Sequence, residues 1–165
     1  MTFEFATVYD RRFDEVDRIA QEFFQIDKDP NQIKADEETF LYSLEIGGRT
    51  LGAFEGDKMI GWSFAFPTNQ ILMEQFLSNK ITEKELFWST KKDPNYDAIY
   101  FCAMYVYPEY RSLSLALKLI YKCIDPLLKE GVCIFYDPYS SQGEILGKFI
   151  KRGNKYQIKS KTFQH

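Results

Sequence analysis

The chain has 165 residues, of which 45% are hydrophobic and 27% are charged, and its formal net charge is −3. These values predict one compact globular domain over residues 1–165, whose core is large enough to be stable without disulfides or a structural metal. The negative balance argues against nucleic acid as a partner, because affinity for nucleic acid comes largely from basic surfaces.

Cysteine and histidine usage excludes several other classes of protein. Cys102, Cys123 and Cys133 lie in apolar segments, and the only histidine is His165. Three cysteines in such contexts indicate buried free thiols in a reducing compartment, and a single terminal histidine argues against a zinc site or a histidine-based triad. No segment resembles a membrane span or a signal peptide. We therefore expect a cytoplasmic protein, monomer or homodimer, without a metal or membrane contact.

The first half of the chain predicts a strand, two helices and a hairpin. Residues 3–9 alternate in the manner of a strand. Apolar residues at helical spacing predict helices over about 12–25 and 36–46, and Gly47-Gly48 ends the second of them. Strands over 50–55 and 59–66 flank a short turn and form the hairpin.

The next segment, over about 68–97, is predicted to be a helical insertion with one or two short helices. Thr82 and Glu85 have the spacing of a capping box just before an apolar triplet. The segment also contains large apolar residues that need burial, so we expect it to pack on the domain.

The second half is predicted to alternate strands with helices. Residues 98–107 form a nearly unbroken apolar run, typical of a central strand covered on both faces. Strand alternation predicts Tyr100 and Cys102 on one face of this strand and Tyr105 on the other. A leucine-rich helix over about 112–129 follows, in which Pro126 should kink the helix or set its last turn. Its predicted buried face consists of Leu113, Leu117, Ile120, Ile124 and Leu127.

A strand over 132–136, a helix over 143–152 and a strand over 156–163 complete the chain. The element order is β-α-α-β-β-β-α-β-α-β, with the insertion before the fourth strand. This order predicts an α/β (α+β) fold in which helices flank a mixed central sheet. Residues 98–136 should form a right-handed parallel crossover.

The turn before the leucine-rich helix is the most informative motif. Pro108-Glu109-Tyr110-Arg111 leads directly from the apolar strand into the helix. The first N–H groups of a helix have no partner inside it, and together with the helix dipole they can bind phosphate. The motif alone leaves two interpretations open, a site for a phosphate-bearing cofactor or a strand–turn–helix without a ligand.

The motif resembles the cofactor loop of the GNAT superfamily of acyl-CoA-dependent N-acyltransferases, Gln/Arg-x-x-Gly-x-Gly/Ala after a strand ending in Val-x-Pro. Val106 and Pro108 match the strand end, Arg111 the first loop position and Ala116 the last. Ser114 replaces the family's middle glycine. Its Cβ adds bulk, but its hydroxyl can donate to a phosphate oxygen. The element order is similar to that of the superfamily over nearly the whole chain.

The resemblance implies direct transfer of an acyl group, most simply acetyl, from acyl-CoA to a primary amine on a small molecule or peptide. It also implies that the pyrophosphate binds the loop and that the pantetheine arm lies where the two parallel strands splay apart. The residues implied to bind acyl-CoA are Met104, Val106, Arg111, Ser112, Leu113, Ser114, Leu115, Ala116 and Gln142.

The catalytic residues match the family less well. Aligning residues 149–154 with Tyr-Glu-Lys-Leu-Gly-Phe of the ribosomal-protein N-terminal acetyltransferases places Asp137 at the position of their base, although Asp before Pro is also common in turns. The same alignment places Phe149 at the position of their tyrosine acid, and phenylalanine cannot donate a proton. Tyr136 and Tyr139 are nearby candidates for that role. The alternative function is a GNAT-fold protein that binds a ligand or partner without catalysis.

Overall fold

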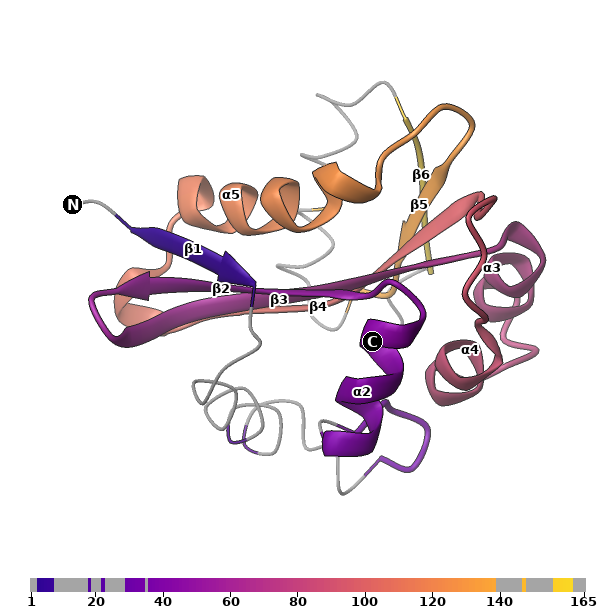
Figure 1. Cartoon of the computed structure of the whole chain (residues 1–165), viewed down its shortest axis with the longest axis horizontal. Coiled ribbons are helices and arrows are strands. Elements are labelled where there is room, and N and C mark those ends of the chain that lie inside the picture. The colour runs from indigo at the N-terminus through magenta and orange to yellow at the C-terminus, as the bar shows by residue number, and fades with distance from the viewer. Residues whose placement is uncertain are drawn as a thin grey trace.

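The computed structural model describes residues 3–7, 18, 22, 29–34, 36–138, 147 and 156–161. Within them, a six-stranded sheet runs in the order β1-β2-β3-β4-β5-β6 (Figure 1). Neighbouring strands from β1 to β4 are antiparallel, whereas β5 is parallel to both β4 and β6. The predicted mixed central sheet is therefore confirmed. Its strands are β1 Glu4–Thr7, β2 Arg49–Glu55, β3 Lys58–Thr68, β4 Ala98–Val106, β5 Cys133–Tyr136 and β6 Gln157–Ser160.

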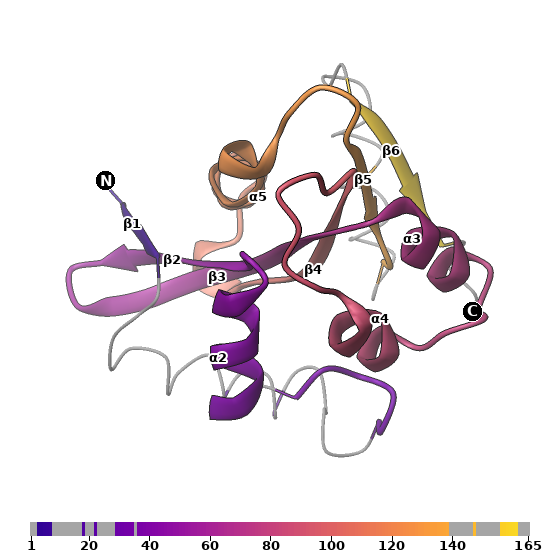
Figure 2. The same ribbon diagram turned by 45° about the vertical axis from the view of Figure 1, so that its right-hand side comes forward.

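Four α-helices in the described residues flank this sheet. They are α2 Glu37–Glu45, α3 Gln70–Leu77, α4 Glu83–Ser89 and α5 Leu113–Ile124. Helix α5 covers one face, α2 lies on the opposite face, and α3 and α4 stand together at the end of the sheet near β5 and β6 (Figures 1 and 2). None of the helices in this part of the chain is long and apolar enough to cross a membrane. The helices predicted over 12–25 and 143–152 lie outside the described residues, apart from Arg18, Glu22 and Gly147.

The segment between β3 and β4 contains the predicted capping box. The Thr82 N–H donates to Glu85 Oε2 at 2.7 Å, and the Glu85 N–H donates to Thr82 Oγ1 at 3.1 Å. Phe76 and Phe87 are almost fully buried and pack with Phe66 of β3. The capping box thus starts α4, and apolar burial fixes α3 and α4 on the sheet face opposite α5.

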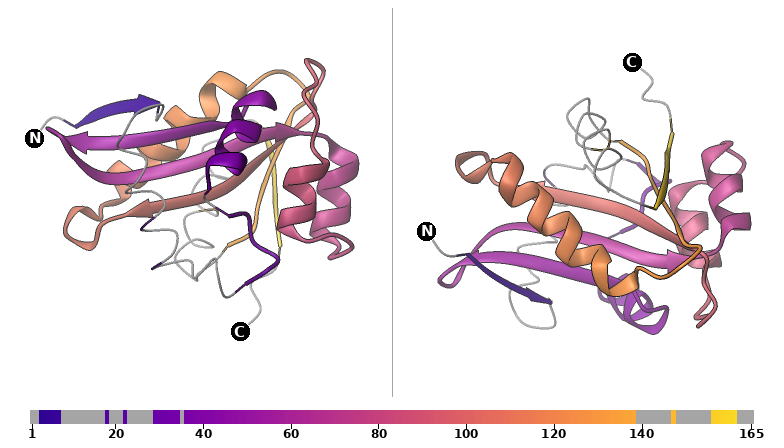
Figure 3. Two further views of the ribbon diagram at one scale, coloured as in Figure 1. Left: turned by 60° about the horizontal axis from the view of Figure 1, so that its bottom comes forward. Right: turned by 90° about the horizontal axis from the view of Figure 1, so that it is seen from above.

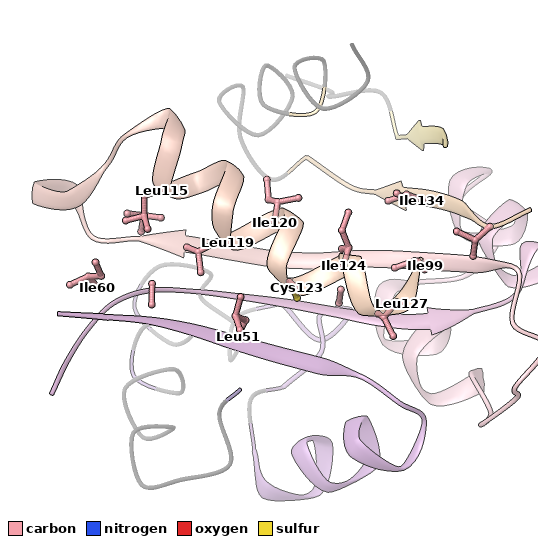
Figure 4. Packing of buried hydrophobic residues seen from close by; sticks show 14 residues of the cluster. Leu51, Ile60, Ile99, Leu115, Leu119, Ile120, Cys123, Ile124, Leu127 and Ile134 are labelled. Atoms are coloured by element: carbon pink, nitrogen blue, oxygen red, sulfur yellow. The ribbon is translucent and has the colours of Figure 1, made fainter. Parts of the chain in front are cut away.

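Ile120, Ile124 and Leu127 are buried as predicted, but the first turns of α5 bury a different face from the predicted one. Leu113 is 47% exposed and Leu117 is only partly buried, whereas Leu115 and Leu119 are in the core. Residues four apart lie on one face of a helix, so Cys123 continues the line from Leu115 and Leu119 toward the sheet (Figure 4). Alternating apolar residues from 113 to 119 fit more than one helical face, and the prediction selected the wrong one for these first turns. The α-helix ends at Ile124, earlier than the predicted end near residue 129. Pro126 lies in the 3₁₀ turn η3 Asp125–Leu127 that follows directly, so it sets the last turn, one of the two roles predicted for it.

A β-bulge interrupts β4 at Cys102. Phe101 pairs with Ala65 of β3, and Ala103 pairs with Phe64, so Cys102 is an extra residue without a counterpart. An extra residue reverses the alternation of the side chains that follow it.

The bulge moves Tyr105 to a face that simple alternation does not predict. Tyr105 pairs with Trp62, and Tyr100 pairs with Phe66. Trp62 and Phe66 are an even number of residues apart in β3 and share the face opposite α5, as do their cross-strand partners. The prediction that Tyr105 faces away from Tyr100 was wrong, because it assumed a regular strand.

Candidate functional site

Strands β4 and β5 are paired over only part of their length. The parallel pairs run from Ala98 with Cys133 to Phe101 with Tyr136, where β5 ends. β4 continues through residues 102–106, which among the described strands pair with β3 alone. The bulge lies at the point of separation. Figure 3 shows β4 continuing past the end of β5 beneath α5.

Met104 and Val106 direct their main-chain groups away from β3, to the side of β4 where β5 no longer pairs with it. The Tyr107 N–H donates to the carbonyl of Ile60 at 3.0 Å, so Tyr107 faces β3. Successive residues of an antiparallel strand direct their main-chain groups alternately toward the partner and away from it. Tyr105 therefore also faces β3, and Met104 and Val106 face away. The edge predicted to hold the thioester end of an acyl-CoA is thus present in the fold.

Helix α5 starts beside the end of this edge. Ser112 is its N-cap, and Ser112 Oγ accepts a hydrogen bond from the Leu115 N–H at 3.1 Å. The N–H groups of Leu113 and Ser114 also belong to the first turn, where N–H groups have no partner within the helix. Residues 111–114 are exposed, whereas the Leu115 side chain is buried and Ala116 is partly buried. The predicted binding site for the pyrophosphate is therefore the exposed first turn of α5, from which the Leu115 side chain packs into the core.

Arg111 links the start of α5 to the end of β4. Its Nε donates to the Val106 carbonyl at 3.0 Å, and its Cζ lies 5.9 Å from the centre of the Tyr105 ring. The side chain is exposed, but its guanidinium turns back toward β4. Arg111 thus closes the turn in addition to carrying positive charge near the helix start.

The 3₁₀ turn η2 Pro108–Tyr110 is held against the turn between β2 and β3. The Tyr110 hydroxyl donates to Glu55 Oε2 at 2.6 Å. Lys58 Nζ lies 3.5 Å from Glu109 Oε1 and 5.1 Å from the centre of the Tyr110 ring. These contacts fix η2, which leads into the N-terminus of α5, against the turn between β2 and β3.

A cluster of polar side chains lies on the face opposite α5, close to where β5 leaves β4. Glu83 is the first residue of α4, and its Oε1 accepts hydrogen bonds from the Tyr100 hydroxyl at 2.7 Å and the Cys102 thiol at 3.5 Å. Asp137 directly follows β5 and interacts electrostatically with Glu83, Tyr100 and Cys102. We call these four residues the Glu83 cluster.

Burial and mutual repulsion shape the ionisation of the Glu83 cluster. Burial raises the pKa of Glu83, and the charge of Asp137 raises it further, against the hydrogen bonds from Tyr100 and Cys102. Asp137 is exposed on one side, but the protein atoms around its carboxyl still raise its pKa, while the charge of Lys161 lowers it. Burial holds the pKa of the Cys102 thiol well above its usual range. Cys102 is therefore a protonated hydrogen-bond donor here and not a nucleophile.

The structure places the other predicted catalytic residues differently. Tyr136 is buried, and its cross-strand partner Phe101 packs with the α5 core, so Tyr136 and Asp137 lie on opposite faces of the sheet. A side chain at Gly147 would clash with the Tyr136 hydroxyl, which shows how closely that hydroxyl packs. Tyr139, Gln142 and Phe149 lie outside the described residues.

Glu83 is the residue of this cluster that the sequence did not reveal. The capping box signals that Glu83 is the first residue of a helix. Nothing local indicates that this helix packs beside Tyr100 and Cys102, because that contact depends on how the segment between β3 and β4 folds back onto the sheet.

No family model matches the sequence, and a search of curated proteins finds no match. Solved structures, however, share the fold. Naa50 from Arabidopsis thaliana, in complex with the bisubstrate analogue CoA-Ac-MVNAL, is 13% identical, with a TM-score of 0.57 over 92% of this chain and 82% of that one.

Two further solved structures are similar over almost the whole chain. Ribosomal-protein-alanine N-acetyltransferase from Brucella melitensis is 13% identical, with a TM-score of 0.56 over 99% of this chain and 100% of that one. The aminoglycoside acetyltransferase meta-AAC0020 from an uncultured soil metagenomic sample is 11% identical, with a TM-score of 0.57 over 99% of this chain and 95% of that one. At these identities the similarity establishes the fold and not the substrate.

Proposed function

We propose that this chain, which has the GNAT fold, is an N-acyltransferase that moves an acyl group, most simply acetyl, from acyl-CoA directly to a primary amine. The observation that carries the proposal is the junction of two features. The main-chain edge of β4 beyond Phe101 has no β5 partner, and it leads straight to the exposed first turn of α5.

The residues at this junction suit the chemical groups of acyl-CoA. The N–H groups of Leu113 and Ser114, the helix dipole and the Ser114 hydroxyl would bind the pyrophosphate. The main-chain groups of Met104 and the N–H of Val106 would pair with the amides of the pantetheine arm, as a neighbouring strand would, while the Val106 carbonyl is held by Arg111. Acyl-CoA supplies the activated acyl group as a thioester, and an N–H of the β4 edge would polarise its carbonyl.

Asp137 is the proposed base. The neutral amine attacks the thioester carbonyl carbon, the C–N bond forms, and the C–S bond breaks with its electron pair leaving on sulfur. Before this attack, Asp137 removes one proton from the ammonium form of the acceptor, which gives the neutral amine, and its raised pKa makes it a better base than an ordinary aspartate. The second proton, which the nitrogen loses once the C–N bond has formed, passes to water. Since Tyr136 packs on the other face, we propose that water protonates the thiolate.

The similar structures support both the proposed acyl donor and the proposed class of acceptor. Naa50 was solved with the bisubstrate analogue CoA-Ac-MVNAL, and the other two similar structures are acetyltransferases whose names specify ribosomal-protein alanine and aminoglycosides. A small-molecule or peptide amine is therefore the acceptor class that we propose.

Binding of acetyl-CoA tests the proposal. Calorimetry should detect acetyl-CoA binding, and acetylpantetheine, which lacks the pyrophosphate, should bind more weakly. Ser114→Asp should reduce affinity for acetyl-CoA about tenfold or more by placing a negative charge beside the pyrophosphate, without changing affinity for acetylpantetheine. Ser89→Asp, at an exposed position at the end of α4, is the matched control. Absence of acetyl-CoA binding would refute the transferase and favour the noncatalytic alternative.

A further inference from the structure

We propose that Glu83, supplied by the segment between β3 and β4, binds the ammonium group of the acceptor, and that the acceptor is therefore a cationic amine approaching from the α4 side. This inference rests on the proposed function, which it extends from the acyl donor to the acceptor. It assigns a role in substrate recognition to a segment that lies outside the acyl-CoA junction.

Glu83 is fixed in place by donors from separate parts of the chain. Tyr100 and Cys102 donate to the same carboxylate oxygen from β4, and the Ile33 backbone N–H interacts with the carboxylate from the loop before α2. Glu83 as a whole residue is partly exposed, whereas Tyr100 is fully buried. Burial is the main cause of the raised pKa of Glu83, so the carboxylate is held among protein atoms while part of the residue meets solvent.

The hydrogen bonds to Glu83 do not offset the cost of burying its charge. Its pKa stays raised although Tyr100, Cys102 and the Ile33 backbone all donate to the carboxylate. At Glu83 that penalty is increased further by Asp137, whose charge acts on the same carboxylate. Lys161 acts on Asp137, whereas the largest contributions to the shift at Glu83 are burial, three hydrogen bonds and the charge of Asp137. A ligand that brings positive charge would relieve this repulsion.

The position of Glu83 matches the amine end of the proposed reaction. Glu83 lies against Cys102, the bulge residue at which β4 and β5 separate, and it is coupled to Asp137, the proposed base. An ammonium group bound at Glu83 would stand close to the carboxylate that must remove its proton. Glu83 would select and hold the amine, and Asp137 would deprotonate it.

Carboxyl ¹³C NMR tests this assignment with a simple cation in place of the natural acceptor. Protein labelled in its glutamate and aspartate carboxyls is titrated with butylammonium chloride, and with sodium chloride and butanol as controls for ionic strength and the alkyl chain. Glu83→Gln identifies the Glu83 resonance. Binding of the cation should lower the pKa of Glu83, because a nearby positive charge favours the ionised form, and neither control should do so.

The variants separate this role from a structural one. Glu83→Gln keeps the hydrogen-bond acceptor but should weaken butylammonium binding about tenfold or more, with acetyl-CoA affinity unchanged. Glu74→Gln, at an exposed position of α3, should change neither. If Glu83 responds to butylammonium as it does to sodium chloride, the inference is wrong even when acetyl-CoA binds. If acetyl-CoA fails to bind but Glu83 responds, the transferase is wrong and the amine site stands.

Discussion

Replacing Leu119 with alanine should destabilise the protein severely. Leu119 is fully buried between α5 and the sheet, and its carbonyl accepts a hydrogen bond from Ser63 Oγ at 3.1 Å. A Cβ added to Gly61 would lie 3.1 Å from Leu119 Cδ1, so strand backbone packs directly against the leucine. Backbone in a central strand cannot collapse into the space that a smaller side chain leaves. We therefore expect the upper part of the range for such substitutions, about 4 kcal/mol.

Urea unfolding of the variant measures this loss directly, provided that the transition is two-state. For a chain of this size the same loss lowers Tm by roughly 8–16 °C. The matched control is Leu113→Ala in the same helix. Leu113 is 47% exposed, so its truncation should destabilise by less than about 1 kcal/mol.

The pair of variants also tests the rotation of α5 about its axis, which decides which residues of its first turn are exposed. If Leu113→Ala were as damaging as Leu119→Ala, the helix would present a different face to the sheet. The proposed contact of the Ser114 hydroxyl with phosphate would then lose its structural basis.

Three further predictions concern the site. Ser114→Gly should keep or increase affinity for acetyl-CoA in calorimetry, because glycine lets the backbone approach more closely; a large loss would mean that the hydroxyl itself holds phosphate. Asp137→Asn should reduce turnover of an acylated amine about a hundredfold or more, with acetyl-CoA affinity intact; an unchanged rate would exclude Asp137 as the base. Glu83→Gln should change how stability depends on pH. Folding raises the pKa of Glu83 above its ordinary 4.5. The free energy of unfolding of the wild type should therefore fall relative to that of the variant as pH rises from 4.5 through the raised pKa, and urea unfolding across this pH range measures the difference. A difference that does not vary with pH would contradict the raised pKa.

Features encoded over a few residues were predictable from the sequence. The hairpin of β2 and β3 follows from two apolar runs around a short turn, and the start of α4 follows from the capping box at Thr82 and Glu85. The mixed sheet follows from the order of the elements. In each of these cases the signal lies within the segment that folds.

Features set by contacts between distant segments were not predictable in the same way. The bulge at Cys102 depends on the register between β3 and β4, and it reversed the face expected for Tyr105. The buried side of α5 was ambiguous because its first turns are apolar at alternating positions. Glu83 was missed because its neighbours Tyr100 and Asp137 come from other parts of the chain.

The separation of β4 from β5 would bring the proposed donor and acceptor chemistry together at one place in this fold. Main-chain N–H and C=O groups need hydrogen-bond partners, and β3 supplies them along one side of β4. Beyond Phe101, β5 supplies none on the other side, so an extended arm with amide groups can take the place of a strand there. The same separation leaves Asp137 at the end of β5, next to the carboxylate that α4 brings in. A thioester lying along β4 and an amine held on the α4 side would therefore meet where the two strands part.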